Sequence, residues 1–418
     1  MHWKKLTQVE ISERVKAALD KNINYRKGLL LGVPATYLDN EIFYDNAPFL
    51  EDAPFLQTLI ANPNHIGCHT MEEVESLPYF SGTQEIEREL LTVCAQEIFK
   101  AEPNQFDGYV SQGGTEANIQ AMWVYRNYFM SEMGVSANEI GLVYSEDSHY
   151  SMPKGANILG LHSMVIDVDD ASHQMDLNQL QTKLTEAKKQ GVKCFIVVQN
   201  MATTMFGSID DVSKTANVFI ENNHSFKLHV DAAFGGFIVP FADNSDELSF
   251  KNPHISSFTL DGHKMLQTPY GTGIFLIRKN FMKYVKTEEA KYVNGTDFTL
   301  SGSRSGAISV ALWMSLMVHG NIGWQAIVEK LLDRTSFLCN KLDQMGVQYF
   351  RDPRVNIITI KSECISKELA LKYGLVADDA DGEAKWWKIV VMQHVKQDII
   401  EKFVKELKSE QVSSESTH

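Results

Sequence analysis

Short apolar runs that alternate with amphipathic stretches dominate the chain between residues 141 and 277. The runs have the length of strands and lie at 141–144, 164–168, 194–198, 226–230, 256–260 and 273–277. Apolar residues recur at helical spacing between several of them, as in 177–187 and 212–220. This alternation predicts an α/β fold, with a mainly parallel central sheet covered by helices on both faces. Functional residues are then expected at the carboxyl ends of the strands, where such sheets bind ligands.

The pattern changes after about residue 305, which indicates a second, smaller α+β domain. Helices are predicted over 308–345 and 397–407, and strands over 355–360 and 387–392, with a loop or a short helix and loop over 365–385. A chain of 418 residues is long enough for two cores. We therefore predict an N-terminal segment (1–70), a large domain (71–306), a small C-terminal domain (307–408) and a disordered polar tail (409–418).

Composition and charge argue against several classes of function. The first 28 residues carry charged side chains throughout, so no signal sequence is expected. The longest apolar run, 308–318, is shorter than the roughly 20 residues of a membrane span. The net charge of −14 offers no basic face for nucleic acid, and the 5 scattered cysteines are typical of reduced thiols. We expect a cytoplasmic protein that binds neither membrane nor nucleic acid.

A glycine turn followed directly by a helical pattern forms the first motif, Ser-Gln-Gly-Gly-Thr-Glu-Ala-Asn at 111–118. Backbone amides at such a helix start form an anion site, which the helix dipole favours. The alternative is an ordinary tight turn in which Thr115 caps the helix. The motif alone does not decide between them.

Two further motifs each end a strand-like run. In the first, Asp231 is followed by the small residues of Ala-Ala-Phe-Gly-Gly, which leave room for a bulky group. In the second, Lys264 follows His263 and is framed by apolar residues, where it could act as a nucleophile toward an aldehyde. The alternatives are an aspartate that caps a turn and a lysine that reaches the surface.

In this order, the three motifs resemble those of the group II amino-acid decarboxylases, which depend on pyridoxal phosphate (PLP). That family has the fold type I architecture of the aspartate aminotransferases. The similarity runs from about residue 82 to 407 and is strongest to the short histidine, serine, tyrosine and aspartate decarboxylases. It implies PLP as cofactor, a homodimer with shared active sites, and conversion of an L-amino acid to its amine and carbon dioxide.

The resemblance also implies roles for individual residues. Lys264 would bind PLP as a Schiff base, Asp231 would pair with the ring nitrogen, and His149 would stack on the ring. The phosphate would be bound by Gly114, Thr115 and His263, and the cofactor would also contact Thr204 and Ala233. The family usually has glycine where Ala202 stands, which weakens the assignment of Thr204.

Residues beyond Lys264 are implied to complete the site. Ser301 and Gly302 match an element that approaches the phosphate of the partner subunit. Tyr292 falls on the family's mobile loop, where a tyrosine returns a proton to the substrate carbon; Tyr284 is its competitor.

Three residues are candidates for contact with the substrate: His65, His69 and Arg304. His65, Cys68 and His69 have a spacing that could suit a metal, but no fourth ligand is evident, so no metal is predicted. The strand at 387–395 is interpreted as structural. The N-terminal segment, with aromatic residues between 30 and 70, would line the site or the dimer interface, where aromatic and imidazole substrates fit, but these residues could equally be core. Serine, aspartate and non-standard amino acids also remain open as substrates.

Two other functions use the same fold. A transaminase or a carbon–carbon lyase could employ the same lysine and aspartate. A non-catalytic ligand-binding relative is the third possibility, against which the presence of Lys264, Asp231 and His149 argues.

Overall fold

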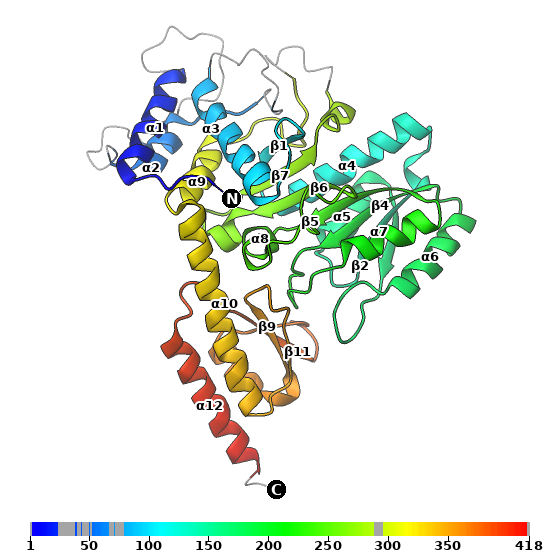
Figure 1. Ribbon diagram of the computed structural model, residues 1–418, viewed down its shortest axis with the longest axis vertical. Coiled ribbons are helices and arrows are strands. Elements are labelled where there is room, and N and C mark those ends of the chain that lie inside the picture. The colour runs from blue at the N-terminus through cyan, green and yellow to red at the C-terminus, as the bar shows by residue number, and fades with distance from the viewer. Residues whose placement is uncertain are drawn as a thin grey trace.

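A seven-stranded sheet forms the centre of the large domain in the computed structural model (Figure 1). The structure describes residues 2–23, 38, 39, 43, 50, 52–66, 71, 79–287 and 296–415, with side chains to residue 412. The strand order is β1 (Phe106–Ser111), β7 (Gly273–Arg278), β6 (Ile255–Asp261), β5 (Ser225–Asp231), β4 (Cys194–Asn200), β2 (Ile140–Ser145), β3 (His162–Ile166). Within this sheet only β7 runs antiparallel to its neighbours. The mainly parallel sheet is confirmed.

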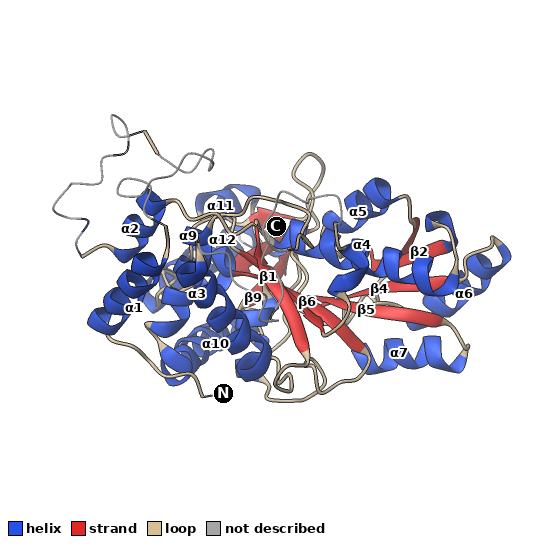
Figure 2. Cartoon of the chain, turned by 90° about the horizontal axis from the view of Figure 1, so that it is seen from above, coloured by secondary structure: helices blue, strands red, loops and turns tan. Residues whose placement is uncertain are grey.

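Helices cover both faces of this sheet, as the apolar runs predict. Every residue of β2, β4 and β6 is buried, which requires packing on both sides. Figure 2 shows α4 (Gly114–Met133) and α5 (Ser151–Leu159) above the sheet and α7 (Val212–Glu221) below it. Helix α6 (Leu177–Lys189) packs with α7. The six predicted strands are confirmed, whereas β1 was not predicted because its sequence, with Asp107 and Gly108, lacks an apolar run.

The N-terminal helices pack beside the large domain. These are α1 (Gln8–Lys21), α2 (Pro54–Ala61) and α3 (Ser81–Thr92), which continues into a π-helical turn, Val93–Ile98. They contact α9 (Gly306–Met317). A short helix, α8 (Val239–Ala242), and 3-10 turns at Ala137–Glu139, Gly235–Phe237, Met282–Val285 and Ser362–Cys364 complete the described connections.

The small domain is an antiparallel four-stranded sheet with two helices. Its strand order is β10 (Val376–Ala377), β11 (Trp386–Val390), β9 (Ile357–Lys361), β8 (Tyr349–Phe350). The helices are α11 (Lys367–Lys372), within the predicted loop region, and α12 (Gln397–Glu415), which lies beside α10 (Gly320–Gln344) in Figure 1. The α+β character of this domain agrees with the prediction.

The prediction of a disordered tail from residue 409 was wrong for 409–415. Helix α12 continues to Glu415, and residues 416–418 lie outside the described part. The Glu410 carboxylate accepts a hydrogen bond of 2.6 Å from the Ser366 hydroxyl, which itself caps α11. Polar residues here thus have a tertiary partner that their composition does not reveal.

The boundary between the two cores lies inside α10, not at the predicted position 306. Trp324, Val328 and Leu331 belong to the large core, whereas Leu338 and Leu342 belong to the small one. A continuous helix therefore bridges the domains. Among the described residues no single helix is long and apolar enough to cross a membrane; α9 and α10 reach that threshold only when counted together, across a bend of 78°.

Candidate active site

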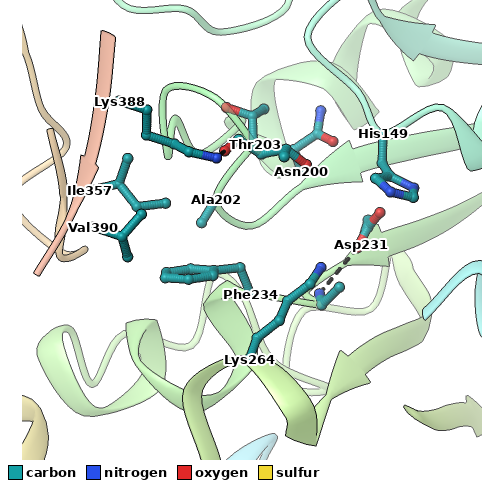
Figure 3. A pocket seen from close by; sticks show the side chains of 12 residues that line it. His149, Asn200, Ala202, Thr203, Asp231, Phe234, Lys264, Ile357, Lys388 and Val390 are labelled. Atoms are coloured by element: carbon teal, nitrogen blue, oxygen red, sulfur yellow. Dashed lines mark hydrogen bonds between the residues drawn. The ribbon is translucent and has the colours of Figure 1, made fainter. Parts of the chain in front are cut away.

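A pocket opens where the strands of the large sheet end, and the small domain closes its other side (Figure 3). Asn200 and Asp231 are the last residues of β4 and β5, and His149 lies in the connection after β2. The lining residues are His149, Asn200, Ala202, Thr203, Thr204, Asp231, Ala233, Phe234, Lys264, Ile357, Lys388 and Val390. The carboxyl ends of parallel strands share one edge, so this location follows from the fold.

Asp231 is held by two hydrogen bonds at the end of β5. Its Oδ1 accepts from the backbone N–H of Ala233 at 3.0 Å, and its Oδ2 accepts from Asn118 Nδ2 at 2.9 Å. The side chain is buried, and the small residues that follow leave the pocket open beside it. The carboxylate is thereby fixed as an acceptor that faces the pocket.

Lys264 enters the pocket from a π-helical turn, Gly262–Leu266, directly after β6. Its Nζ lies 3.2 Å from Asp261 Oδ2, and Figure 3 shows its side chain extending toward Asp231. Burial raises the pKa of the Asp261 carboxyl, and the charge of Lys264 opposes this shift. The amine therefore faces an enclosed polar site, and the alternative of a surface lysine is wrong.

The His149 ring lies beside Asp231 on the wall of the pocket (Figure 3). Its Nδ1 accepts a hydrogen bond of 3.2 Å from the Ser151 N–H, and the Ser151 hydroxyl lies 2.9 Å from the same atom. Burial lowers the pKa of His149, although the Asp231 carboxylate opposes this. A neutral, flat ring held at its edge is suited to cover an aromatic ligand.

The start of α4 forms a cradle for an anion. Gly113, its N-cap, has φ of +110°, a conformation that favours glycine, and no side chain caps the helix, so Thr115 is not the cap. A Cβ on Gly113 would lie 3.9 Å from His263 Cε1. His263 Nδ1 is buried and has no hydrogen-bond partner among the described residues. A phosphate bound by the α4 amides would supply that partner.

A turn after β4 brings Thr204 into the pocket wall. Ala202 has φ of +73°, in the left-handed region, which explains why glycine is usual there in the family. Thr203 N donates to the Ser208 carbonyl at 3.0 Å and closes the turn. Thr204 and Ala233 both line the pocket as predicted.

The small domain contributes pocket residues that the sequence did not reveal. Lys388 Nζ donates to the Thr204 carbonyl at 3.0 Å, and burial lowers the pKa of Lys388. Val390, two residues further along β11, and Ile357 of β9 add an apolar surface (Figure 3). The strand at 387–395 was interpreted as structural. Its sequence did carry a sign of the pocket, because Lys388 and Val390 are two residues apart and so lie on the same face of a strand.

Two of the three substrate candidates are placed elsewhere. His65 is fully buried: its Nδ1 pairs with Glu87 and its Nε2 lies 2.8 Å from Thr83 Oγ1. Arg304 is buried too, with Nη1 2.7 Å from Glu87 Oε1. Both belong to an ion-pair network within the large domain, so their assignment to the substrate was wrong. His69 lies outside the described residues.

The remaining predicted residues lie near the pocket or outside the described part. The Ser301 hydroxyl donates to Glu116 Oε2 at 2.9 Å, which places Ser301 and Gly302 beside the first turn of α4. Tyr292 is outside the described residues. Its competitor Tyr284 donates to Glu132, at the opposite end of α4 from the pocket. Tyr284 therefore lies away from the pocket of its own chain.

The described residues fit PLP. An amine (Lys264), a carboxylate (Asp231) and an imidazole (His149) match its aldehyde, its ring nitrogen and its ring face. The start of α4, with the unpaired His263 Nδ1, matches its phosphate. No group of three or more metal-binding side chains occurs in the described part of the chain.

Curated proteins of similar sequence include amino-acid decarboxylases. The chain is 47% identical over 406 residues to the tryptophan decarboxylase of Clostridium sporogenes (strain ATCC 15579), covering 97% of both chains. It is 30% identical to the histidine decarboxylase of Vibrio campbellii (strain ATCC BAA-1116), over 72% of this chain and 74% of that protein.

Solved structures share the fold. The L-methionine decarboxylase of Streptomyces sp.590 has a TM-score of 0.69 at 19% identity, over 95% of this chain and 93% of that one. The glutamate decarboxylase of Lactobacillus brevis CGMCC 1306 has a TM-score of 0.68 at 18% identity, over 98% and 93%. Residues 63–351 match the pyridoxal-dependent decarboxylase conserved domain. The chain therefore belongs to this family and is a PLP-dependent enzyme that decarboxylates an amino acid.

Proposed function

We propose that the substrate is an aromatic L-amino acid, with L-tryptophan the first candidate. The observation that carries this proposal is the apolar part of the pocket, formed by Ala202, Phe234, Ile357 and Val390. It lies between the two domains and across from Asp231 (Figure 3). An indole ring gains from leaving water for such a surface. The 47% identity to a tryptophan decarboxylase supports the same choice.

Four polar residues of the pocket have roles in this reaction: Asp231, Lys264, His149 and Lys388. PLP, when bound, supplies the electron-accepting ring that stabilises the carbanion left by carbon dioxide. Asp231 would hold the proton of the ring nitrogen, and Lys264 would hold the cofactor through its aldehyde. His149 covers the ring and excludes water. Lys388 Nζ carries the positive charge that attracts the substrate carboxylate into the pocket.

We also propose a homodimer in which Ser301 and Gly302 approach the phosphate of the other subunit. The family resemblance is the ground for this arrangement, since Ser301 itself bonds to Glu116 at the start of α4 in its own chain. Tyr292 is the proposed proton donor. Sedimentation velocity tests the dimer, and mixing Lys264→Ala with Gly302→Trp chains tests the sharing. Mixed dimers then contain one intact site and regain activity; two inactive chains that stay inactive together would contradict shared sites.

Product analysis tests the substrate. The PLP-loaded protein is incubated with a mixture of the common L-amino acids, and products are identified by mass spectrometry. Tryptamine is expected, and it should be absent with Lys264→Ala. A single amine from a non-aromatic amino acid would refute the aromatic proposal while leaving decarboxylation intact, and the amine of tyrosine or phenylalanine would refute only the choice of tryptophan. A keto acid or an aldehyde in place of an amine would favour a transaminase or a lyase.

A pair of variants tests the apolar surface itself. Ile357→Ala removes a wall of the pocket and should lower kcat/KM for tryptophan about 10-fold, which corresponds to the loss of a few methylene contacts. Ile358→Ala, the next residue of β9, belongs to the small-domain core and is the control. It should lower stability but leave the ratio of kcat/KM for tryptophan and histidine unchanged. Equal ratios in both variants would refute the role of this surface.

A further inference from the structure

A buried chain of hydrogen bonds leads away from the pocket behind Asp231. It begins at Asn118, in the second turn of α4, whose side chain is 1% exposed. Asn118 Nδ2 donates to Asp231 Oδ2 at 2.9 Å and to Ser151 Oγ at 3.0 Å. Both hydrogens of the amide nitrogen are thus used. The amide oxygen must then be the atom that faces His229.

His229 continues the chain and is fully buried. Its Nε2 lies 2.9 Å from Asn118 Oδ1, which can only accept, so Nε2 carries a proton. Its Nδ1 lies 2.7 Å from Ser257 Oγ and must accept the hydroxyl hydrogen. Thr259 Oγ1, 3.1 Å from Nε2, shares the same proton. Burial lowers the pKa of His229 to about 4, so the ring is neutral and in one tautomer at neutral pH.

The chain ends in the core of the large domain. Tyr125, also in α4, donates its hydroxyl hydrogen to Ser257 Oγ. Every donor from Tyr125 to Asn118 therefore points the same way, toward Asp231. Bonds aligned in this manner polarise one another in a low-dielectric interior. The last donor in the series meets the carboxylate that serves the cofactor.

We propose that Asn118 and His229 are positioning residues for the decarboxylation. Through them the series Tyr125–Ser257–His229–Asn118 fixes the Asp231 carboxylate in orientation and keeps it a hydrogen-bond acceptor toward the PLP ring nitrogen. His229 acts only through Asn118 and does not touch the pocket. Its neutral Nε2–H tautomer orients the Asn118 amide, and the amide orients Asp231.

Substitutions along the series should lower the degree to which the PLP ring nitrogen is protonated. The effect should become smaller with distance from Asp231. Asn118→Leu removes the donor to Asp231 and should lower kcat about 10-fold or more, the cost of one hydrogen bond to a charged group, with little change in KM. His229→Leu should have a smaller effect of the same kind, and Tyr125→Phe the smallest. His229→Gln keeps a donor near the Nε2 position and should restore most of the loss seen with His229→Leu.

The state of the cofactor provides a readout besides activity. The NMR chemical shift of the ring nitrogen in isotope-labelled PLP separates the protonated from the neutral ring, and Asn118→Leu should move it toward neutral. Thr335→Val is the control, because it removes a buried hydrogen bond of 2.7 Å within α10, away from the site. It should leave kcat and the chemical shift unchanged.

Two results would overturn the proposal. One is an unchanged ring-nitrogen shift in Asn118→Leu; the other is a loss in His229→Gln as large as in His229→Leu, which would indicate a packing role. Urea unfolding of each variant identifies any that fails to fold. If Asn118→Leu does not fold, the comparison of the two His229 variants, with the same NMR measurement, decides.

Discussion

Removing Arg304 from its buried pair with Glu87 should be among the most destabilising single substitutions in the large domain. The two side chains are 2% and 6% exposed, and Arg304 Nη1 lies 2.7 Å from Glu87 Oε1. Arg304 also donates to the Val110 carbonyl at 2.9 Å, and its guanidinium lies 5.2 Å from the centre of the Tyr109 ring. Arg304→Met keeps the apolar stem and removes the charge, which leaves a carboxylate buried without its cation.

The loss of stability in Arg304→Met depends on the contacts that Glu87 keeps. Breaking one partner of a buried pair costs about 3–5 kcal/mol. Glu87 keeps the Val110 N–H at 2.8 Å and its contact with His65, so we expect the lower end, about 3 kcal/mol. Burial raises the pKa of Glu87, but Arg304 and His65 outweigh this and hold it well below its usual range.

The destabilisation by Arg304→Met should depend on pH through the protonation of His65. Burial lowers the pKa of His65, Glu87 raises it, and Arg304 lowers it further. Without Arg304 the His65 ring gains a proton more readily and replaces the lost cation. The destabilisation should therefore be larger at pH 8 than at pH 6, by about 1 kcal/mol.

Equilibrium unfolding in urea, with PLP bound, measures this difference. Arg14→Met is the matched control, because Arg14 pairs with Glu89 at the surface and its loss should cost less than about 1 kcal/mol. A double variant, Arg304→Met with Glu87→Gln, should regain part of the stability, since the buried charge is gone. A loss for Arg304→Met as small as that of Arg14→Met, or one independent of pH, would refute the reasoning.

Four further predictions follow from particular contacts. Ala202→Gly relieves the strain of a left-handed backbone but adds conformational entropy to the unfolded chain. It should therefore raise the free energy of unfolding, measured in urea, by about 0.5 kcal/mol, and a clear loss of stability would contradict the strain. Ending the chain after Lys408 removes the Glu410 acceptor of Ser366 and should cost about 1 kcal/mol, whereas an unchanged urea midpoint would mean that the last turns of α12 contribute nothing. His229 has a folded pKa of about 4, below its usual 6.5, so the unfolded chain binds more protons between these values. Stability should fall there by roughly 1.4 kcal/mol per pH unit on acidification, and the slope should be shallower in His229→Gln; equal slopes would exclude this histidine. Lys388→Met should raise KM about 10-fold, and Lys388→Arg should raise it less; equal effects would show that position, rather than charge, matters.

Local patterns in the sequence were sufficient for the large sheet and for the core of the site. Six strands were found from short apolar runs because strands buried on both faces are apolar throughout. Lys264, Asp231 and the glycine turn before α4 were found because each follows a strand or begins a helix, and their chemistry depends on those positions. The family resemblance then linked the three to one cofactor.

The domain boundary and the pocket residues of the small domain depended on tertiary contacts. Apolar residues recur at helical spacing through α9 and α10, so the sequence predicts helix over both but not which core each turn packs against. Lys388 and Ile357 reach the pocket only because the small domain folds back over the large one. In the tail helix Glu410 accepts a hydrogen bond from Ser366, 44 residues away in the chain.

The same distinction explains why His65 and Arg304 were misplaced. As residue types they suit a substrate carboxylate, and the sequence carries no sign that Glu87, 22 residues from His65 and 217 from Arg304, would lie between them. Periodicity and motifs indicate which face of a segment is buried and which secondary structure it forms, because both depend on residues that are close in the sequence. The sequence by itself thus determined the fold class and the cofactor, and it predicted three parts of the pocket, Lys264, Asp231 and His149, that the structure brings together. Which charges neutralise one another, and which side chains face the substrate, was decided by packing between distant segments.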